Sequence, residues 1–241
     1  MLNIVTALTV EAKPIIKHFK LKSQNEIYRN NYINLIITGN GKIKSAINTA
    51  LLLNKFKYPT LNIGIAGSNK YDINKGFYIH KITDNDTKLN YYPDFFKHPS
   101  EELITISKPN KYFPLVDMEG SGFFEAAYKF LNVDEIILYK IVSDTPGTTP
   151  KKELITNLIH SHIHVIEELL DIFSKPKDKT VDELLKEAES KMKLTATQKV
   201  QLKQILTLYK IKNIPFPDFK ELKKKEEVKE FITSLFSSLE I

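Results

Sequence analysis

Three acidic residues stand where β-rich runs of the sequence end, and together they could perform acid–base chemistry. Glu11 follows the first such run, Glu119 follows a later one, and Asp144 follows the last. Ligands of open α/β sheets bind at the carboxyl ends of the strands, so we expect the three carboxylates to share one edge. Cleaving a glycosidic bond needs one group that protonates the leaving group and one that prepares water, roles that carboxyl groups can fill. Taken singly, each acid could instead cap a helix or close a turn.

The elements that must position these acids alternate between strand and helix up to about Phe173. This pattern predicts an α/β fold with a mostly parallel, mixed central sheet flanked by helices, and several runs are continuously apolar, as in strands covered on both faces. The predicted strands are Leu2–Leu8, Tyr32–Thr38, Leu61–Ala66, Phe77–Thr83, Leu103–Ser107, Pro114–Met118 and Ile136–Ser143. The predicted helices are Lys42–Phe56, Phe123–Leu131 and one that opens at Thr149 and Pro150 and runs to about Phe173.

The character of the sequence changes after Phe173. A polar linker, Ser174–Thr180, leads into helical patterns alone, and we therefore expect a main domain of residues 1–173 and an all-helical C-terminal extension of residues 174–241. The predicted helices of the extension are Val181–Lys193, Thr197–Lys210 and Lys224–Leu239. They are amphipathic, so they could cover the main domain, dimerise or dock a partner.

Composition excludes several classes of function. The 241 residues include no cysteine, which removes disulfides, thiolate nucleophiles and cysteine-based metal sites. The formal charge of +6 comes from lysine, because Arg29 is the sole arginine, and a chain without arginine forks is poorly equipped to read bases or clamp phosphate. We expect no nucleic-acid partner. The sequence opens on an apolar run without a basic leader, and no run approaches the roughly 18 apolar residues of a membrane span, so we expect a cytoplasmic protein without membrane contact.

Two glycine-containing turns also follow predicted strands, as the three acids do. Gly39 and Gly41 join a strand to a helix, and Gly64 and Gly67 lie at the end of the next strand. Small residues there allow a ligand to approach the backbone, and a following helix N-terminus offers N–H donors. Neither turn matches a P-loop or a dinucleotide fingerprint, so nucleotide hydrolysis and hydride transfer have no motif behind them.

A histidine-rich segment, His160 to His164, invites a metal-site interpretation because its outer histidines stand one helical turn apart. Both lie on the polar face of the predicted helix, and no carboxylate-rich motif accompanies them. We therefore expect no metal site and no cofactor.

The order of these segments resembles the purine nucleoside phosphorylase and uridine phosphorylase superfamily, and within it the methylthioadenosine/S-adenosylhomocysteine nucleosidases. The resemblance covers roughly residues 1–173, which it identifies as a nucleosidase-like catalytic domain. It depends on five segments: the first strand with Ala7 and Glu11, the turn Gly39–Lys42, the run Asn62–Gly67, Val116–Glu119, and Ile141–Asp144. The Val-Asp-Met-Glu and Ser-Asp elements are the specific ones.

The resemblance implies a role for each acid. Glu11 matches the carboxylate that orients or deprotonates the attacking water, and Asp144 matches the acid that protonates N7 of the departing purine, with Ser143 beside it. Glu119 matches the carboxylate that accepts hydrogen bonds from the ribose hydroxyls, and Met118 matches the residue that lies against the ribose. For Asp144 to donate a proton near neutrality its pKa must be raised, whereas Glu11 must stay ionised.

Two departures from the family pattern concern the substrate. Ile65 stands where the nucleosidases carry a serine or threonine; we place it with Gly67 among the substrate-binding residues. The stretch between Asp84 and Val116 is shorter than in those enzymes, and its base-framing loop would begin at Lys108 and Pro109. Four aromatic residues have two interpretations, stacking on a base or packing in the core or a dimer contact: Tyr91, Tyr92, Phe95 and Phe96.

The first hypothesis is therefore an enzyme that hydrolyses a purine nucleoside to free base and sugar, with methylthioadenosine, S-adenosylhomocysteine and 5'-deoxyadenosine as candidate substrates. A phosphate-dependent phosphorylase is a second reading, although Arg29 falls in no phosphate motif of the superfamily. A third is a catalytically inactive nucleoside-binding module whose helical tail binds a partner. From the resemblance we also expect a homodimer.

Overall fold

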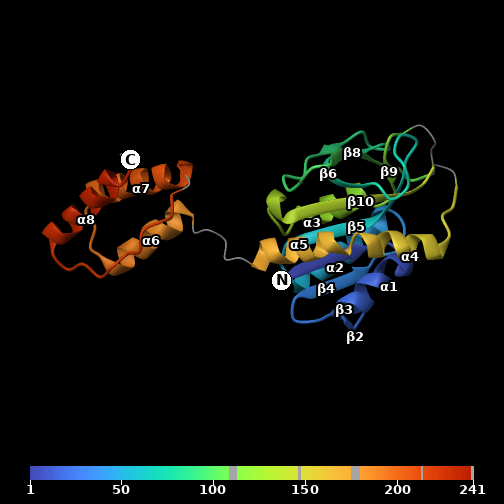
Figure 1. Ribbon diagram of the computed structural model, residues 1–241, viewed down its shortest axis with the longest axis horizontal. Helices are drawn as coiled ribbons and strands as arrows, with labels where there is room; N and C mark the ends of the chain where they lie inside the picture. Colours follow the sequence, from blue (N-terminus) through green and yellow to red (C-terminus); the bar gives the residue numbers. More distant parts are fainter. Residues whose placement is uncertain (109–112, 146–147, 175–179, 213, 240–241) are drawn as a thin grey trace. The chain divides into compact units, whose positions relative to one another are not determined.

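The computed structural model describes residues 1–108, 113–145, 148–174, 180–212 and 214–239. The chain divides into two compact units, Met1–Lys175 and Pro176–Ile241, which are described separately. Figure 1 traces the chain through both. Within the described residues, no helix is long and apolar enough to span a membrane.

A ten-stranded mixed sheet organises the first unit, in the order β10-β6-β8-β9-β5-β1-β4-β3-β2, with β7 paired to β6. Strand β10 also pairs with β5, so five strands, β5, β10, β6, β8 and β9, form a closed ring. The long ladders from β4 through β1 and β5 to β10 are parallel. The strands are β1 Leu2–Thr6, β2 Lys22–Gln24, β3 Ile27–Arg29, β4 Ile33–Ile37, β5 Thr60–Gly67, β6 Gly76–Asp84, β7 Asn90–Tyr91, β8 Ser100–Thr105, β9 Val116–Asp117 and β10 Ile136–Asp144.

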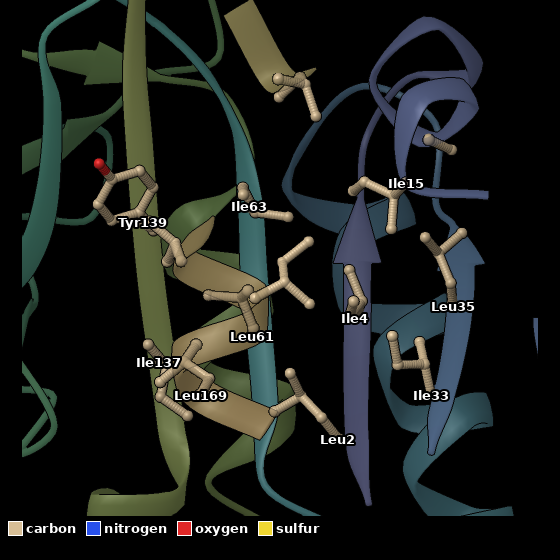
Figure 2. Packing of buried hydrophobic residues seen from close by; sticks show 14 of the residues in the cluster. Leu2, Ile4, Ile15, Ile33, Leu35, Leu61, Ile63, Ile137, Tyr139 and Leu169 are labelled. Atoms are coloured by element: carbon tan, nitrogen blue, oxygen red, sulfur yellow. The ribbon is translucent and has the colours of Figure 1, made fainter. Parts of the chain in front are cut away.

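Helices cover both faces of this sheet because its central strands are apolar on both sides. On one face, α1 (Thr9–His18), α4 (Lys152–Ser161) and α5 (Ile163–Ser174) pack on β1, β4, β5 and β10. Figure 2 shows the alternate residues of these strands, such as Ile4, Leu61 and Ile137, directed at Ile15 of α1 and Leu169 of α5. On the other face lie α2 (Lys42–Lys55) and α3 (Gly120–Ala127). The α/β prediction is confirmed.

Three details differ from the sequence prediction. The first strand ends at Thr6 and α1 begins at Thr9, so Glu11 lies in the first turn of a helix. The helix expected from Thr149 to Phe173 is two helices, α4 and α5, and α4 begins at Lys152. The break falls at His162, whose ring binds the hydroxyl of Tyr139 at 2.9 Å and the carbonyl of Asn74 at 3.2 Å. The short strands β2, β3 and β7 were not predicted.

The second unit is helical, with α6 (Val181–Lys191), α7 (Ala196–Ile211) and α8 (Lys225–Ser237) around a core of its own. Thr180 and Thr195 each cap a helix by accepting a backbone N–H three residues later, at 3.2 and 3.3 Å. The core includes Leu202, Leu206 and Tyr209 of α7.

Candidate active site

A cavity of about 310 Å³ opens at the carboxyl ends of β1, β5 and β10, beside β9. All seven residues singled out from the sequence line it: Glu11, Ile65, Gly67, Met118, Glu119, Ser143 and Asp144. The parallel strands β1, β5 and β10, and β9, which is antiparallel to β5, bring them together although they come from segments far apart in the chain. The structure thus gathers the three acids around one hollow.

The Glu11 carboxylate joins the ends of two strands to the start of α1. One oxygen, Oε2, accepts hydrogen bonds from the backbone N–H groups of Ala7 (3.0 Å) and Leu8 (2.8 Å), and Oε1 accepts one from Ile65 (2.9 Å). Burial raises the pKa of Glu11, although these backbone donors and the Lys140 ammonium oppose the rise. A carboxylate offers about four lone-pair sites, so one site remains for a further donor such as water.

Glu119 follows β9 and is held by the turn before α2. Its Oε1 accepts the backbone N–H of Gly41 at 2.8 Å. Burial, followed by the neighbouring Asp117 carboxylate, raises the pKa of Glu119 to about 7. The carboxyl group therefore exchanges its proton near neutrality, and a ligand hydroxyl that donates to it would favour the ionised form.

The Gly41 N–H reaches Glu119 because the start of α2 is tightly fixed. Gly41 has φ of 99°, a conformation that suits glycine. Across from it, a side chain at Gly122 of α3 would place its Cβ 2.2 Å from the carbonyl oxygen of Lys42, so only glycine permits this helix contact. The Lys42 ammonium also pairs with Asp84 at the end of β6, at 2.9 Å.

Sequence analysis missed a buried ion pair behind the acids. Lys140 of β10 lies 2.9 Å from Asp117 of β9, and their side chains are 2% and 0% exposed. Asp117 also accepts the Thr105 hydroxyl and the backbone N–H of Gly120, both at 2.8 Å. Burial lowers the pKa of Lys140, but the surrounding carboxylates outweigh burial and raise it. The sequence does contain a signal for this ion pair, because Lys140 lies inside the apolar run Ile136–Ser143. A buried lysine needs an anionic partner.

A bulge at the end of β10 places Asp144 at the cavity. The register with β5 shifts between Val142 and Asp144, which turns the side chain relative to a regular strand. The Ser143 hydroxyl donates to Asp144 Oδ1. Burial raises the pKa of Asp144, and the Ser143 hydrogen bond partly opposes this. The acid is thus displaced toward its protonated form.

The remaining predictions for the site have mixed outcomes. The four aromatic residues suggested for stacking are not among the lining residues: Phe95 packs on Tyr78 and Phe173, and Tyr91 packs on Phe124. The loop expected to begin at Lys108 and Pro109 lies mostly outside the described residues. Among the residues that the structure does describe, no group of three or more histidines and acids could hold a metal ion.

Comparison with known proteins gives a consistent result for the fold. No protein-family profile and no curated protein sequence matches this chain. Solved structures do match. The apo 5'-methylthioadenosine nucleosidase of Arabidopsis thaliana aligns with a TM-score of 0.61 at 16% identity, over 73% of this chain and 96% of that one. An MTAN from Chlamydia trachomatis aligns with a TM-score of 0.60 at 16% identity, over 71% and 98%.

A third match is the 5'-methylthioadenosine/S-adenosylhomocysteine nucleosidase of S. pneumoniae with a transition-state inhibitor, with a TM-score of 0.56, 16% identity, and coverage of 70% and 97%. The chain therefore has a nucleoside phosphorylase-like α/β fold. Within that class, its fold is the one found in the methylthioadenosine/S-adenosylhomocysteine nucleosidases.

The buried ion pair makes a prediction about stability. Asp117→Asn leaves the Lys140 charge without its partner and should lower the free energy of unfolding by about 3–5 kcal/mol. Adding Lys140→Met removes the unpaired charge. The loss of stability in the double variant should therefore be smaller, by at least about 1 kcal/mol, than the losses of the two single variants added together. Urea unfolding followed by tyrosine fluorescence measures this in the first unit, because every tyrosine except Tyr209 lies there and the chain has no tryptophan. Strictly additive losses would contradict the pairing.

The raised pKa of Glu119 makes a prediction about pH. The folded state keeps a proton on Glu119 between its ordinary pKa of 4.5 and about 7, whereas the unfolded state releases it. The contribution to stability is therefore full below pH 4.5 and is lost as the pH rises to about 7. Between pH 5 and pH 8 the free energy of unfolding of the wild type, minus that of Glu119→Gln, should fall by about 1–3 kcal/mol. The exposed Glu125→Gln serves as the control, and an equal pH slope for both variants would count against the assignment.

Proposed function

We propose that this protein hydrolyses the N-glycosidic bond of a purine nucleoside and releases the free base and the sugar. The observation that carries the proposal is the placement of Glu11, Glu119 and Asp144 around one cavity, which lies at the carboxyl ends of the parallel strands β1, β5 and β10 and beside β9. Bond cleavage at an oxocarbenium-like centre requires groups for the leaving base, the sugar and the water, and the cavity offers one acid for each.

Asp144 is the proposed acid for the departing base. Its Oδ1 is occupied by the Ser143 hydroxyl, so a proton is carried on Oδ2, where it can be donated to N7 of the purine. The pKa of Asp144 is raised by burial, which keeps a fraction of the group protonated nearer neutrality. Protonation of N7 neutralises the charge that develops on the base as the bond breaks.

Glu119 and Glu11 serve the sugar and the water in this proposal. Glu119 accepts hydrogen bonds from the ribose hydroxyls, and Met118 lies against the sugar ring beside it. Glu11 uses its remaining lone-pair site to accept a hydrogen bond from the attacking water. Because three backbone donors fix the carboxylate, the water is oriented without any rearrangement of Glu11.

Water is favoured over phosphate as the nucleophile by the charge of the site. The lining includes the carboxyl groups of Glu11, Asp117, Glu119 and Asp144, which would repel a phosphate anion. Arg29 lies in β3, with its guanidinium 4.9 Å from the centre of the Phe56 ring. Candidate substrates are methylthioadenosine and S-adenosylhomocysteine, which appear in the names of enzymes that share the fold, and 5'-deoxyadenosine.

A base-release assay tests the proposal. Incubation of the protein with each candidate nucleoside, with and without phosphate, should liberate purine independently of phosphate, as measured by chromatography. Asp144→Asn should lower turnover by about 10²–10⁴-fold because the proton donor is lost. Glu11→Gln and Glu119→Gln should also lower it by orders of magnitude, whereas Glu125→Gln on the exposed side of α3 should not. Near-normal release by Asp144→Asn would refute the assigned role.

A non-catalytic nucleoside-binding module is the second candidate, favoured by one observation. The Glu11 side chain is 1% exposed and already accepts three backbone hydrogen bonds, as a purely structural carboxylate would. The same assay separates the two functions. A binding module would be stabilised against heat by a nucleoside yet would liberate no base over a long incubation.

We also infer a homodimer that uses the outer face of α2. Ile43, Ile47 and Leu51 follow one another at four-residue spacing and are 76%, 56% and 51% exposed. Three large apolar side chains on one helix face are costly to leave in water, and a second copy of the chain would bury them.

Sedimentation velocity should find a dimer for the wild type and a monomer for Ile47→Asp, because a buried carboxylate at the centre of the interface is strongly unfavourable. Tyr32→Asp changes an equally exposed residue outside α2 and should leave the dimer intact. A monomeric wild type would overturn the inference.

A further inference from the structure

The second unit carries an apolar groove between α7 and α8 whose walls lie outside the core of the unit. The groove encloses about 960 Å³, and Ile205 and Ile232 form its buried floor. Its walls include Val200, Leu208 and Phe236, which are 59%, 39% and 52% exposed. Val200, Leu208 and Phe236 are not part of the core of the unit, whereas Ile205 and Ile232 are.

Helix α7 explains why the groove exists. A surface helix of a globular protein usually shows one apolar stripe, which faces its core. In α7 that stripe is Leu202, Leu206 and Tyr209, whereas Val200 and Leu208 lie outside it and face the groove. The sequence therefore retains apolar residues on a second face, where packing within the unit does not require them.

The two helices of the groove run in the same direction. The Tyr209 hydroxyl donates to the carbonyl of Leu235 at 3.2 Å, and the Lys212 ammonium donates to the carbonyl of Leu239 at 2.6 Å, so the C-terminal ends of α7 and α8 lie together. A groove between two parallel helices can accept a third helix, as in other helix-in-groove complexes.

The charges at the groove indicate the chemistry of its occupant. Among the described residues that line it, the charged ones are Lys203 of α7 and Lys229 of α8. Lys203 already pairs with the exposed Asp182 of α6 at 2.8 Å, so Lys229 is the lysine that carries the charge argument. The other polar lining residues are neutral: Gln198, Gln201, Gln204, Thr207 and Thr233. A second copy of the unit docked face to face would bring lysines against lysines, so self-association is disfavoured.

We propose that the α7–α8 groove binds an amphipathic helix of a partner protein, with an apolar stripe between Leu208 and Phe236 and acidic residues beside Lys229. The apolar walls supply the binding free energy, because aromatic and aliphatic anchors dominate such interfaces. Lys229 selects an acidic partner over a basic one.

The test uses the full chain and two synthetic 16-residue peptides labelled with fluorescein. Both carry leucine at positions i, i+3, i+4 and i+7; one has glutamate on the flanks of the leucine stripe, and the other has lysine in its place. By fluorescence anisotropy, the acidic peptide should bind at least about tenfold more tightly than the basic peptide at 0.1 M salt, and the difference should shrink at 0.5 M salt.

Variants assign the binding to the groove. The double variant Leu208→Ala and Phe236→Ala should raise the Kd of the acidic peptide by about tenfold or more. The exposed Ile211→Ala, on α7 but outside the groove, is the matched apolar control and should leave the Kd within about twofold. Unchanged helical circular dichroism in every variant excludes unfolding as the cause.

Charge reversal provides a gain of function that a misfolded protein could not show. Lys229→Glu should weaken the acidic peptide and strengthen the basic one, whereas Lys193→Glu, outside the groove, should do neither. The proposal is overturned if the acidic peptide does not bind, as when the chain itself fills the groove. It is also overturned if both peptides bind equally, if Ile211→Ala is as damaging as the groove variant, or if the groove variant dissociates a self-assembled form.

Discussion

The buried ammonium of Lys140 is the constraint on which the candidate active site depends. It pairs with Asp117 and acts over a short distance on Glu11 and Glu119, so one positive charge compensates a group of carboxyls that could not otherwise share a low-dielectric site. Burial nevertheless raises the pKa values of Glu11 and Glu119, and at Glu119 the neighbouring Asp117 carboxylate adds to the rise. The burial that encloses these carboxyl groups is therefore also what shifts their pKa values toward neutrality.

The location of the site could be predicted because the sequence indicates where each strand ends. Glu11, Glu119 and Asp144 each follow a β-rich run, and the parallel ladders of β1, β5 and β10 bring Glu11 and Asp144 to one edge. Glu119 reaches the same edge differently, because β9 pairs antiparallel with β5. The internal support of the site could not be predicted in the same way. The apolar run around Lys140 shows that the lysine is buried, but it does not show that Asp117 faces it, since that pairing depends on how β9 and β10 meet in space.

Helix boundaries were less predictable where tertiary contacts override local pattern. The apolar periodicity continues through His162, yet the ring of that residue turns inward to Tyr139 and ends α4. Likewise α1 starts within two residues of β1 and contains Pro14, which obscured a helix in so short a segment. The sequence shows that α7 has apolar residues outside its core stripe. Only the structure shows that they line the same groove as Phe236 of α8.

The closed ring of strands has a consequence for the order of assembly. Strand β10 is the last to be added, and it joins β5 and β6, whose residues precede it by more than fifty positions. It also brings Lys140, Ser143 and Asp144. A growing chain that lacks β10 thus has an open ring of strands and an incomplete cavity, and pairings between residues so distant in the chain form slowly. The cavity can be complete only in a chain that extends at least to Thr149, the last of its described lining residues.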